Sequence, residues 1–273
     1  MQTVRVNGVR IAYELTGSGD IPVVFVHGSW SSHRGWDVLG SLLSDRFRVL
    51  AFDRRGHSAS ERPAGQGNIG EDVDDVAALI EKLHLWPAYV VGNSYGALIT
   101  LRLASTRPDL LRGIVAHEPP LVTMLAEHAE FSPMMKEIDA RIAAVLKHIR
   151  SGDHAGAAER FVETVALGPG QWAQLPPEVR ATFVENAPTF LDEEMDPGSR
   201  GVDLASLEAF SKPALITMGD RSPAIFPTSV RIVADALPSA EVLTIVGAGH
   251  VPHLSHPQAY AEAVTSFIEK SER

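Results

Sequence analysis

Short apolar runs rich in β-branched residues alternate along the chain with helical patterns. Such runs, bounded by turn residues, are typical of strands buried on both faces of a parallel sheet. They are PVVFVH (22–27), RVLAFD (48–53), AYVVG (88–92), GIVAHE (113–118), ALITMG (214–219) and EVLTIV (241–246). Between runs, apolar residues share one helical face at 73–83, and they do so again at 260–268 after the last run. The alternation predicts βαβ units, a mostly parallel sheet and a ligand site near the carboxyl ends of its strands.

Two segments depart from this alternation. Near the N-terminus, Asn7-Gly8 separates two alternating runs, which predicts a β-hairpin. Between about 120 and 202 only helical periodicity is present, interrupted by loops rich in Gly and Pro. We therefore predict a first core part at 1–119, a helical cap at 120–202 and a second core part at 203–273.

Composition narrows the range of partners. Hydrophobic residues make up 45% of the 273 residues, enough for a substantial core, and the net charge is −10. This charge disfavours nucleic acids and anionic membranes as partners, because phosphate binding needs clustered Lys and Arg. Cysteine is absent, which excludes disulfides and thiolate metal sites. The sequence shows neither a secretory signal pattern nor a long apolar run, so we expect a cytoplasmic protein. Its expected partner is a small-molecule substrate, and a homodimer is one possible oligomeric state.

The stretch GNSYG at 92–96 lies between a predicted strand and a predicted helix. This is the context of a nucleophile elbow, a turn so tight that only very small residues fit two positions either side of the serine. A surface turn is the alternative interpretation. The context favours Ser94 as a nucleophile.

A serine nucleophile needs a base, a group that orients the base, and donors for the oxyanion. His250 lies on a Gly-rich loop after the last predicted strand, in TIVGAGHVPHLSHP, where the base is expected. Ser29, in FVHGSW, and Tyr95, after the nucleophile, are the expected oxyanion donors through their backbone amides. We read His253 and His256 as helix-entry or packing residues. The histidines assigned no role are His84, His128, His148 and His154.

The motifs HGSW, DRRGHSAS, GNSYGA and GAGHVPH occur in this order over nearly the whole chain. Together they resemble the α/β-hydrolase superfamily. The resemblance implies an eight-stranded, mostly parallel sheet flanked by helices, with a helical cap inserted after the sixth strand. It also implies that DRRGHS (53–58) is a turn that supports the structure more than the chemistry.

The triad acid departs from the usual family pattern. The family usually carries it after the seventh strand, in a stretch like Gly-x-x-Asp-Pro, where this chain has Ser222 and an earlier Asp220. Glu118, at the end of the sixth strand, is the favoured acid, because a charge at the end of a buried strand is costly unless it is paired. Asp220 is the alternative. The segments AHEPP and GAGHVPHLSHP are similar to parts of zearalenone-type lactone hydrolases, which suggests an ester or lactone substrate.

The remaining candidates concern the substrate pocket and cofactors. Trp30, Trp172 and Met124 could line an apolar pocket, and packing is the alternative for each. Gly65, Gly67 and Gly70 match G-x-G-x-x-G, but a polar loop precedes them where dinucleotide binding needs a strand. The sequence contains neither a phosphate-binding loop nor an H-E-x-x-H motif, so we expect no cofactor and no metal.

Taken together, these features predict a serine hydrolase that cleaves a carboxylic ester or lactone through an acyl-enzyme on Ser94. Two alternatives use the same residues, a C–C bond hydrolase and a cofactor-free perhydrolase or haloperoxidase. A third, of another class, is a non-catalytic protein that binds a ligand on this fold. The presence of Ser, acid and His together argues against this third alternative.

Overall fold

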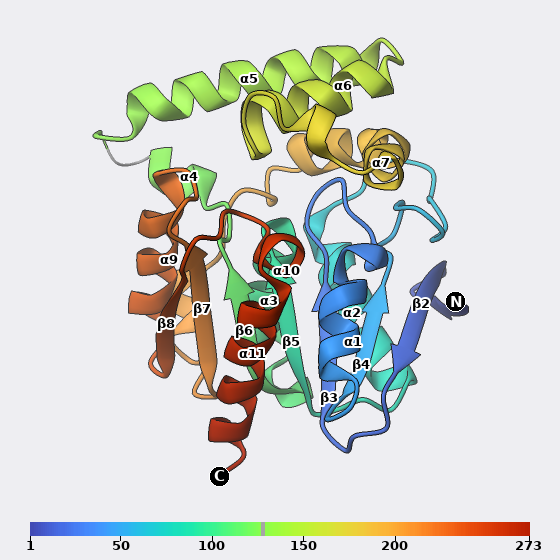
Figure 1. The fold of residues 1–273 in the computed structure, drawn as a ribbon, viewed down its shortest axis with the longest axis vertical. Coiled ribbons are helices and arrows are strands. Elements are labelled where there is room, and N and C mark those ends of the chain that lie inside the picture. Colours follow the sequence, from blue (N-terminus) through green and yellow to red (C-terminus); the bar gives the residue numbers. More distant parts are fainter. Residues whose placement is uncertain (127–128) are drawn as a thin grey trace.

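The computed structural model describes residues 1–126 and 129–273, so His128 lies outside the described residues. Within them, eight strands form one sheet in the order β1-β2-β4-β3-β5-β6-β7-β8 (Figure 1). Pairing is antiparallel for β1–β2 and β2–β4 and parallel for every other neighbour, which confirms the predicted fold class. The strands are β1 Gln2–Val6, β2 Val9–Thr16, β3 Pro22–Val26, β4 Arg48–Phe52, β5 Ala88–Asn93, β6 Leu111–His117, β7 Ala214–Gly219 and β8 Ala240–Ile245.

The strand positions agree with the apolar runs to within a few residues. Asn7 and Gly8 both have positive φ (46° and 81°), as a tight two-residue hairpin turn requires, and they join β1 to β2. Glu118, expected within the sixth strand, lies just beyond its end at His117.

Helices cover both faces of the sheet. Helices α1 and α11 pack on one face, and α2, α3 and α9 pack on the other. Helix α2 begins with a capping box formed by Asn68 and Glu71. The helices are α1 Asp37–Leu43, α2 Ile69–Lys82, α3 Tyr95–Thr106, α4 Val122–Ala126, α5 Ser132–Arg150, α6 His154–Phe161, α7 Pro177–Met195, α8 Leu204–Leu207, α9 Ile225–Ala236, α10 Pro252–Ser255 and α11 Pro257–Ser271.

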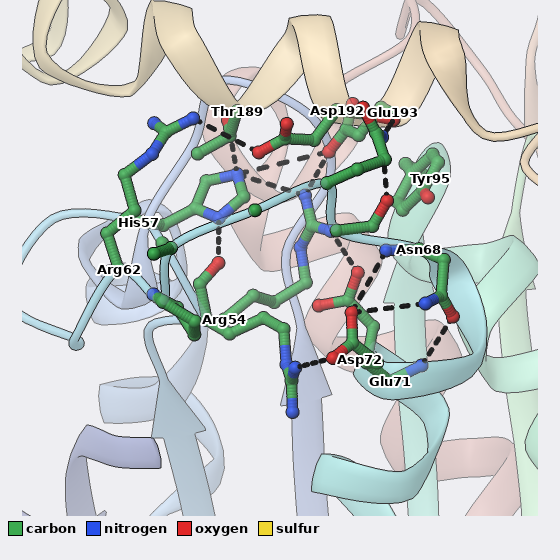
Figure 2. A pocket seen from close by; sticks show the side chains of 17 residues that line it. Arg54, His57, Arg62, Asn68, Glu71, Asp72, Tyr95, Thr189, Asp192 and Glu193 are labelled. Atoms are coloured by element: carbon green, nitrogen blue, oxygen red, sulfur yellow. Dashed lines mark hydrogen bonds and ion pairs between the residues drawn. The ribbon is translucent and has the colours of Figure 1, made fainter. Parts of the chain in front are cut away.

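Helices α5, α6 and α7, here called the cap helices, lie between β6 and β7 in the sequence. In Figure 1 they lie over the carboxyl ends of the parallel strands. A pocket is lined by residues of α7, of the 54–68 loop and of the start of α2 (Figure 2). The predicted boundaries of the cap, at 120 and 202, stay a prediction. Within 1–126 and 129–273, the helices are all too short or too polar to cross a membrane.

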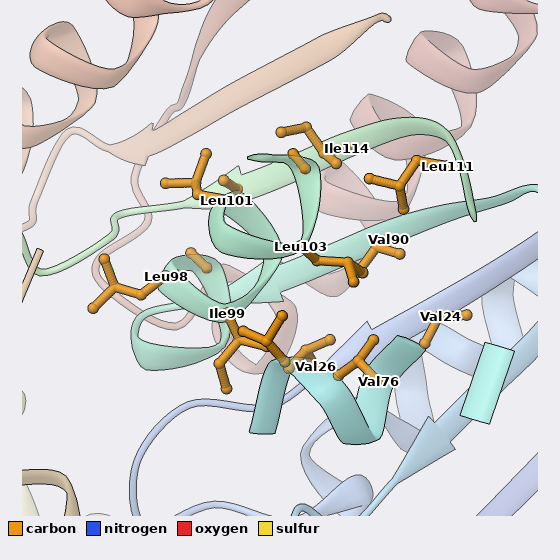
Figure 3. Packing of buried hydrophobic residues seen from close by; sticks show 14 of the residues in the cluster. Val24, Val26, Val76, Val90, Leu98, Ile99, Leu101, Leu103, Leu111 and Ile114 are labelled. Carbon is orange, nitrogen blue, oxygen red and sulfur yellow. The ribbon is translucent and has the colours of Figure 1, made fainter. Parts of the chain in front are cut away.

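The central strands are buried on both faces, so their side chains join two apolar clusters. All five residues of β3 are buried, and so are all six of β5. Figure 3 shows the cluster in which side chains of α2 and α3 pack against β3, β5 and β6. This packing holds the carboxyl ends of β5 and β6 side by side, and it thereby positions the residues that follow each strand.

Candidate active site

Ser94 follows β5 and precedes α3 in a strained backbone conformation. Its φ and ψ are 56° and −121°, in a region that residues other than glycine rarely adopt. Its amide donates to the carbonyl of His117 (2.9 Å), and its own carbonyl accepts from the amide of Ala97 (2.8 Å). The turn therefore raises the serine between the strand and the helix.

Gly92 and Gly96 leave room for this turn. A Cβ on Gly92 would lie 2.2 Å from the Gly96 carbonyl oxygen, and a Cβ on Gly96 would lie 2.1 Å from the carbonyl oxygen of Val26. Gly28 lies beside the serine, since a Cβ there would be 3.1 Å from the Cβ of Ser94. The glycines at both ends of GNSYG are thus required by backbone contacts.

Glu118 and His250, 132 residues apart in the sequence, meet at the ends of β6 and β8. The Nδ1–H of His250 donates to Oε2 of Glu118 over 2.6 Å, and the amide of Gly219 donates to Oε1 over 2.7 Å. The Glu118 side chain has no exposed surface, whereas 11% of the His250 side chain is exposed. With its Nδ1–H donated to the carboxylate, His250 has its Nε2 as the free acceptor.

Electrostatics favour the ionised form of Glu118. Burial by itself raises the pKa of this carboxyl, but the hydrogen bond and the electrostatic attraction from His250 lower it below its ordinary value. His117 lies on the other side, with Nε2 at 3.6 Å from Oε2 of Glu118. Burial lowers the pKa of His117 to about 3, so this ring is neutral. One carboxylate is therefore held ready to stabilise a positive charge on His250.

Asp220, the alternative acid, is engaged elsewhere. Its Oδ1 accepts from the amide of Gly247 over 2.7 Å, on the exposed side of the loop that carries His250. Ser222 is half-buried, and its hydroxyl lies close enough to Glu118 to contribute to the lowered pKa of that carboxyl. Of the two candidates, Glu118 is the one in contact with the imidazole.

The backbone amides of Tyr95 and Ser29 stay the expected oxyanion donors. Tyr95 is the first residue of α3, and the first amides of a helix have no partner within the helix. For Ser29, the preceding carbonyl is held in place, because Nδ1–H of His27 donates to Gly28 O over 2.8 Å. The amide of Arg54 donates to Nε2 of His27 over 3.0 Å, which assigns the proton of this ring to Nδ1. In a trans peptide the Ser29 N–H then points to the opposite side of the loop.

Further contacts tie His250 to the elbow. In the described residues, the Oγ of Ser94 makes no hydrogen bond to His250. Instead, Nδ2 of Asn93 donates to the carbonyl of His250 over 2.9 Å. The ring of Phe226 stacks on the imidazole, with centroids 4.3 Å apart and planes inclined by 17°. The loop and the ring plane of His250 are thus both constrained.

His117, Glu118 and His250 also bring three potential metal ligands within 4.8 Å of one another. Two ligands of one zinc ion at tetrahedral geometry lie about 3.3 Å apart, since each is about 2.0–2.1 Å from the metal. The 2.6 Å separation of His250 Nδ1 and Glu118 Oε2 is shorter. The pair fits a shared proton better than a shared metal ion.

Of the predicted pocket residues, Trp30 and Trp172 belong to one apolar cluster beneath the cap helices, whereas Met124 packs against the core cluster. The Trp30 side chain has no exposed surface, and its ring stacks on Phe161 with centroids 4.7 Å apart, so a substrate contact would require these rings to separate. Trp172 lies in a short turn, Trp172–Gln174, where its amide donates to Glu163 over 2.6 Å. Met124 lies on α4 and is half-buried.

Several neighbours of the site escaped the sequence analysis. No motif in the sequence marks Asn93, His117 or Phe226, and the DRRGHS motif indicates Arg54 only as part of a turn. Asn93 and His117 are buried polar residues at the ends of apolar strands, a pattern that signals a satisfied or functional group. Phe226 carries no such signal, because its contact with His250 arises only from folding.

Comparisons with known proteins agree with this fold. A model of the alpha/beta hydrolase family matches residues 23–263. The chain is 27% identical to 2-(acetamidomethylene)succinate hydrolase of Mesorhizobium japonicum, over 97% of this chain and 94% of that protein. It is 25% identical to the pimeloyl-[acyl-carrier protein] methyl ester esterase of Yersinia pseudotuberculosis, with coverages of 94% and 96%. A crystal structure of an alpha/beta hydrolase from Sphaerobacter thermophilus superposes with a TM-score of 0.78 at 25% identity, over 98% of this chain and all of that one.

Proposed function

The chain belongs to the alpha/beta hydrolase family, and on this premise we propose that it is a serine hydrolase that cleaves a carboxylic ester or lactone. The observation that carries the proposal is the 2.6 Å contact between the buried Glu118 carboxylate and His250, beside the strained turn of Ser94. A nucleophile, a base and an orienting acid are the parts that acyl transfer requires.

In the proposed reaction, Ser94 Oγ attacks the carbonyl carbon while His250 Nε2 takes its proton. Glu118 holds the imidazole in the Nδ1–H tautomer and stabilises its charged form. The amides of Ser29 and Tyr95 bind the oxyanion, at about 3 kcal/mol per donor in comparable sites. His250 returns the proton to the leaving oxygen, the acyl-enzyme forms, and a water activated by His250 then releases the acid and restores Ser94.

An ester bond is favoured by one relative in particular. The esterase from Yersinia pseudotuberculosis is named for a methyl ester, and it aligns with 94% of this chain. A lactone is an internal ester, so the same nucleophile, base and donors would serve it. The carbonyl chemistry of the proposed site and this relative both support an ester or lactone as the proposed substrate class.

The test is labelling of the protein by a fluorophosphonate probe, which needs an activated serine, with Ser94→Ala as the control. We expect labelling of the wild type, its loss in Ser94→Ala, and turnover of a short chromogenic ester and a simple lactone. A folded wild type that neither reacts nor turns over either substrate would contradict the proposal and favour a ligand-binding role.

A further inference from the structure

Arg54 is a buried cation that lies against both proposed oxyanion donors. Its guanidinium Cζ lies 4.7 Å from the centre of the Tyr95 ring, a cation–π contact. Its Nη2 lies 3.5 Å from Gly28 O, the carbonyl of the peptide that carries the Ser29 amide. The backbone amide of Arg54 also donates to Nε2 of His27, and Nδ1–H of His27 donates to the same Gly28 carbonyl. Arg54 therefore contacts the side chain of one donor residue and the peptide group that carries the amide of the other.

Two carboxylates from different parts of the chain hold this guanidinium (Figure 2). Nη1 donates to Asp72 of α2 over 3.1 Å, and Nη2 donates to Glu193 of the cap helix α7 over 2.5 Å. The Arg54 side chain is 1% exposed and that of Glu193 is 6% exposed, so water screens this ion pair weakly.

Glu193 and Asp72 bind different nitrogens of the Arg54 guanidinium. Glu193 binds Nη2, the same nitrogen that lies beside Gly28 O, whereas Asp72 binds Nη1. His57 Nε2 also accepts from Nη2, over 3.1 Å, but it is a neutral partner. Without Glu193, Asp72 is the carboxylate that still binds the guanidinium in the described residues, and its attraction acts through Nη1 toward α2. Other contacts between α7 and the core leave Arg54 untouched, such as the half-exposed pair of Asp192 and Arg62 at 3.0 Å.

We propose that Arg54 is a positioning residue for the oxyanion donors and that Glu193 makes this positioning depend on the docking of cap helix α7. The inference rests on the proposed function. A donor displaced by a fraction of an ångström loses much of its effect on the transition state, while ground-state binding of the substrate is affected little. The cap would thus influence the rate of acylation as well as enclose the substrate.

The experiment compares Glu193→Gln with Asp192→Asn in the full chain. Both variants neutralise a carboxylate on the same helix that pairs with an arginine of the same loop. For wild type and each variant, kcat and KM on a short chromogenic ester and the rate of fluorophosphonate labelling of Ser94 are measured. Thermal unfolding establishes that each variant is folded. Glu193→Asp, which keeps the charge with a shorter reach, replaces Glu193→Gln if that variant does not fold.

We expect Glu193→Gln to lower kcat and the labelling rate tenfold or more with KM within twofold, and Asp192→Asn to change each by less than twofold. In a cycle with Tyr95→Leu, the effect of Glu193→Gln should be smaller than in the wild type, because both act through Arg54. Equal effects of the two single variants, or a rise in KM alone, would overturn the coupling while leaving the hydrolase proposal intact. A wild type that is not labelled would instead refute the hydrolase proposal, and this inference with it.

Discussion

Replacing Glu118 with Gln keeps the size of the side chain and removes its charge. In the structure the carboxylate accepts two N–H groups, from Gly219 and from His250. A glutamine side chain has one acceptor oxygen and one donor nitrogen, so one of these contacts would become a donor facing a donor. Either Gly219 loses its acceptor or the imidazole takes the other tautomer, in which Nε2 cannot accept the proton of Ser94.

The size of the effect follows from the geometry. With Nδ1 and Oε2 2.6 Å apart, the centres of the two charges are about 4 Å apart, and a buried pair at this distance interacts by about 4 kcal/mol at an effective dielectric constant of about 20. A transition state raised by this amount corresponds to about a thousandfold slower reaction. The wrong tautomer adds to this, since Asp→Asn in a serine protease triad lowers kcat about 10⁴-fold. We therefore expect kcat/KM to fall by about 10³–10⁴.

The assay is kcat/KM on a short chromogenic ester for wild type, Glu118→Gln and Asp220→Asn, with near-UV circular dichroism as the check of folding. Asp220 accepts from the exposed amide of Gly247 and does not contact His250, so Asp220→Asn should stay within about threefold of wild type. A folded Glu118→Gln protein that keeps a tenth or more of the activity would refute the reasoning. A collapse in Asp220→Asn alone would identify that residue as the acid.

Three further predictions concern folding, pH and the plane of the imidazole. Gly96→Ala should lower the free energy of unfolding by about 3 kcal/mol or more, because the added Cβ would lie 2.1 Å from the Val26 carbonyl oxygen. An unchanged midpoint of urea unfolding would contradict this prediction. The lowered pKa of Glu118 means that its stabilising contribution is present above about pH 4.5 and is lost as pH falls through the folded-state value. The difference in Tm between wild type and Glu118→Gln should therefore shrink below pH 4.5, and a constant difference would argue against an ionised carboxylate. Phe226→Leu should lower kcat about three- to tenfold, because it removes the ring that stacks on His250. Phe226→Tyr keeps the ring and is the conservative control, so equal rates in both variants would show that the stack has no role.

The strands, the hairpin and the elbow can be predicted from the sequence because each depends on a few consecutive residues. A strand buried on both faces needs a continuous apolar run, as in β3 and β5. The turn at Asn7-Gly8 needs two residues that accept positive φ. Gly92 and Gly96 are required by backbone atoms that would overlap any side chain. The fold class and the place of the Ser94 turn follow from such local rules.

The tertiary structure decided which distant groups share an environment. Glu118 and His250 are 132 residues apart, and Arg54 and Glu193 are 139 residues apart, so no spacing rule links either pair. Whether Glu118 or Asp220 would contact the imidazole depended on where the strand ends lie side by side, to within a hydrogen-bond length. By itself, then, the sequence determined the sheet, the turn and the residue types of the site. The pairing of buried charges was decided only by folding, because burial and distance set their energies.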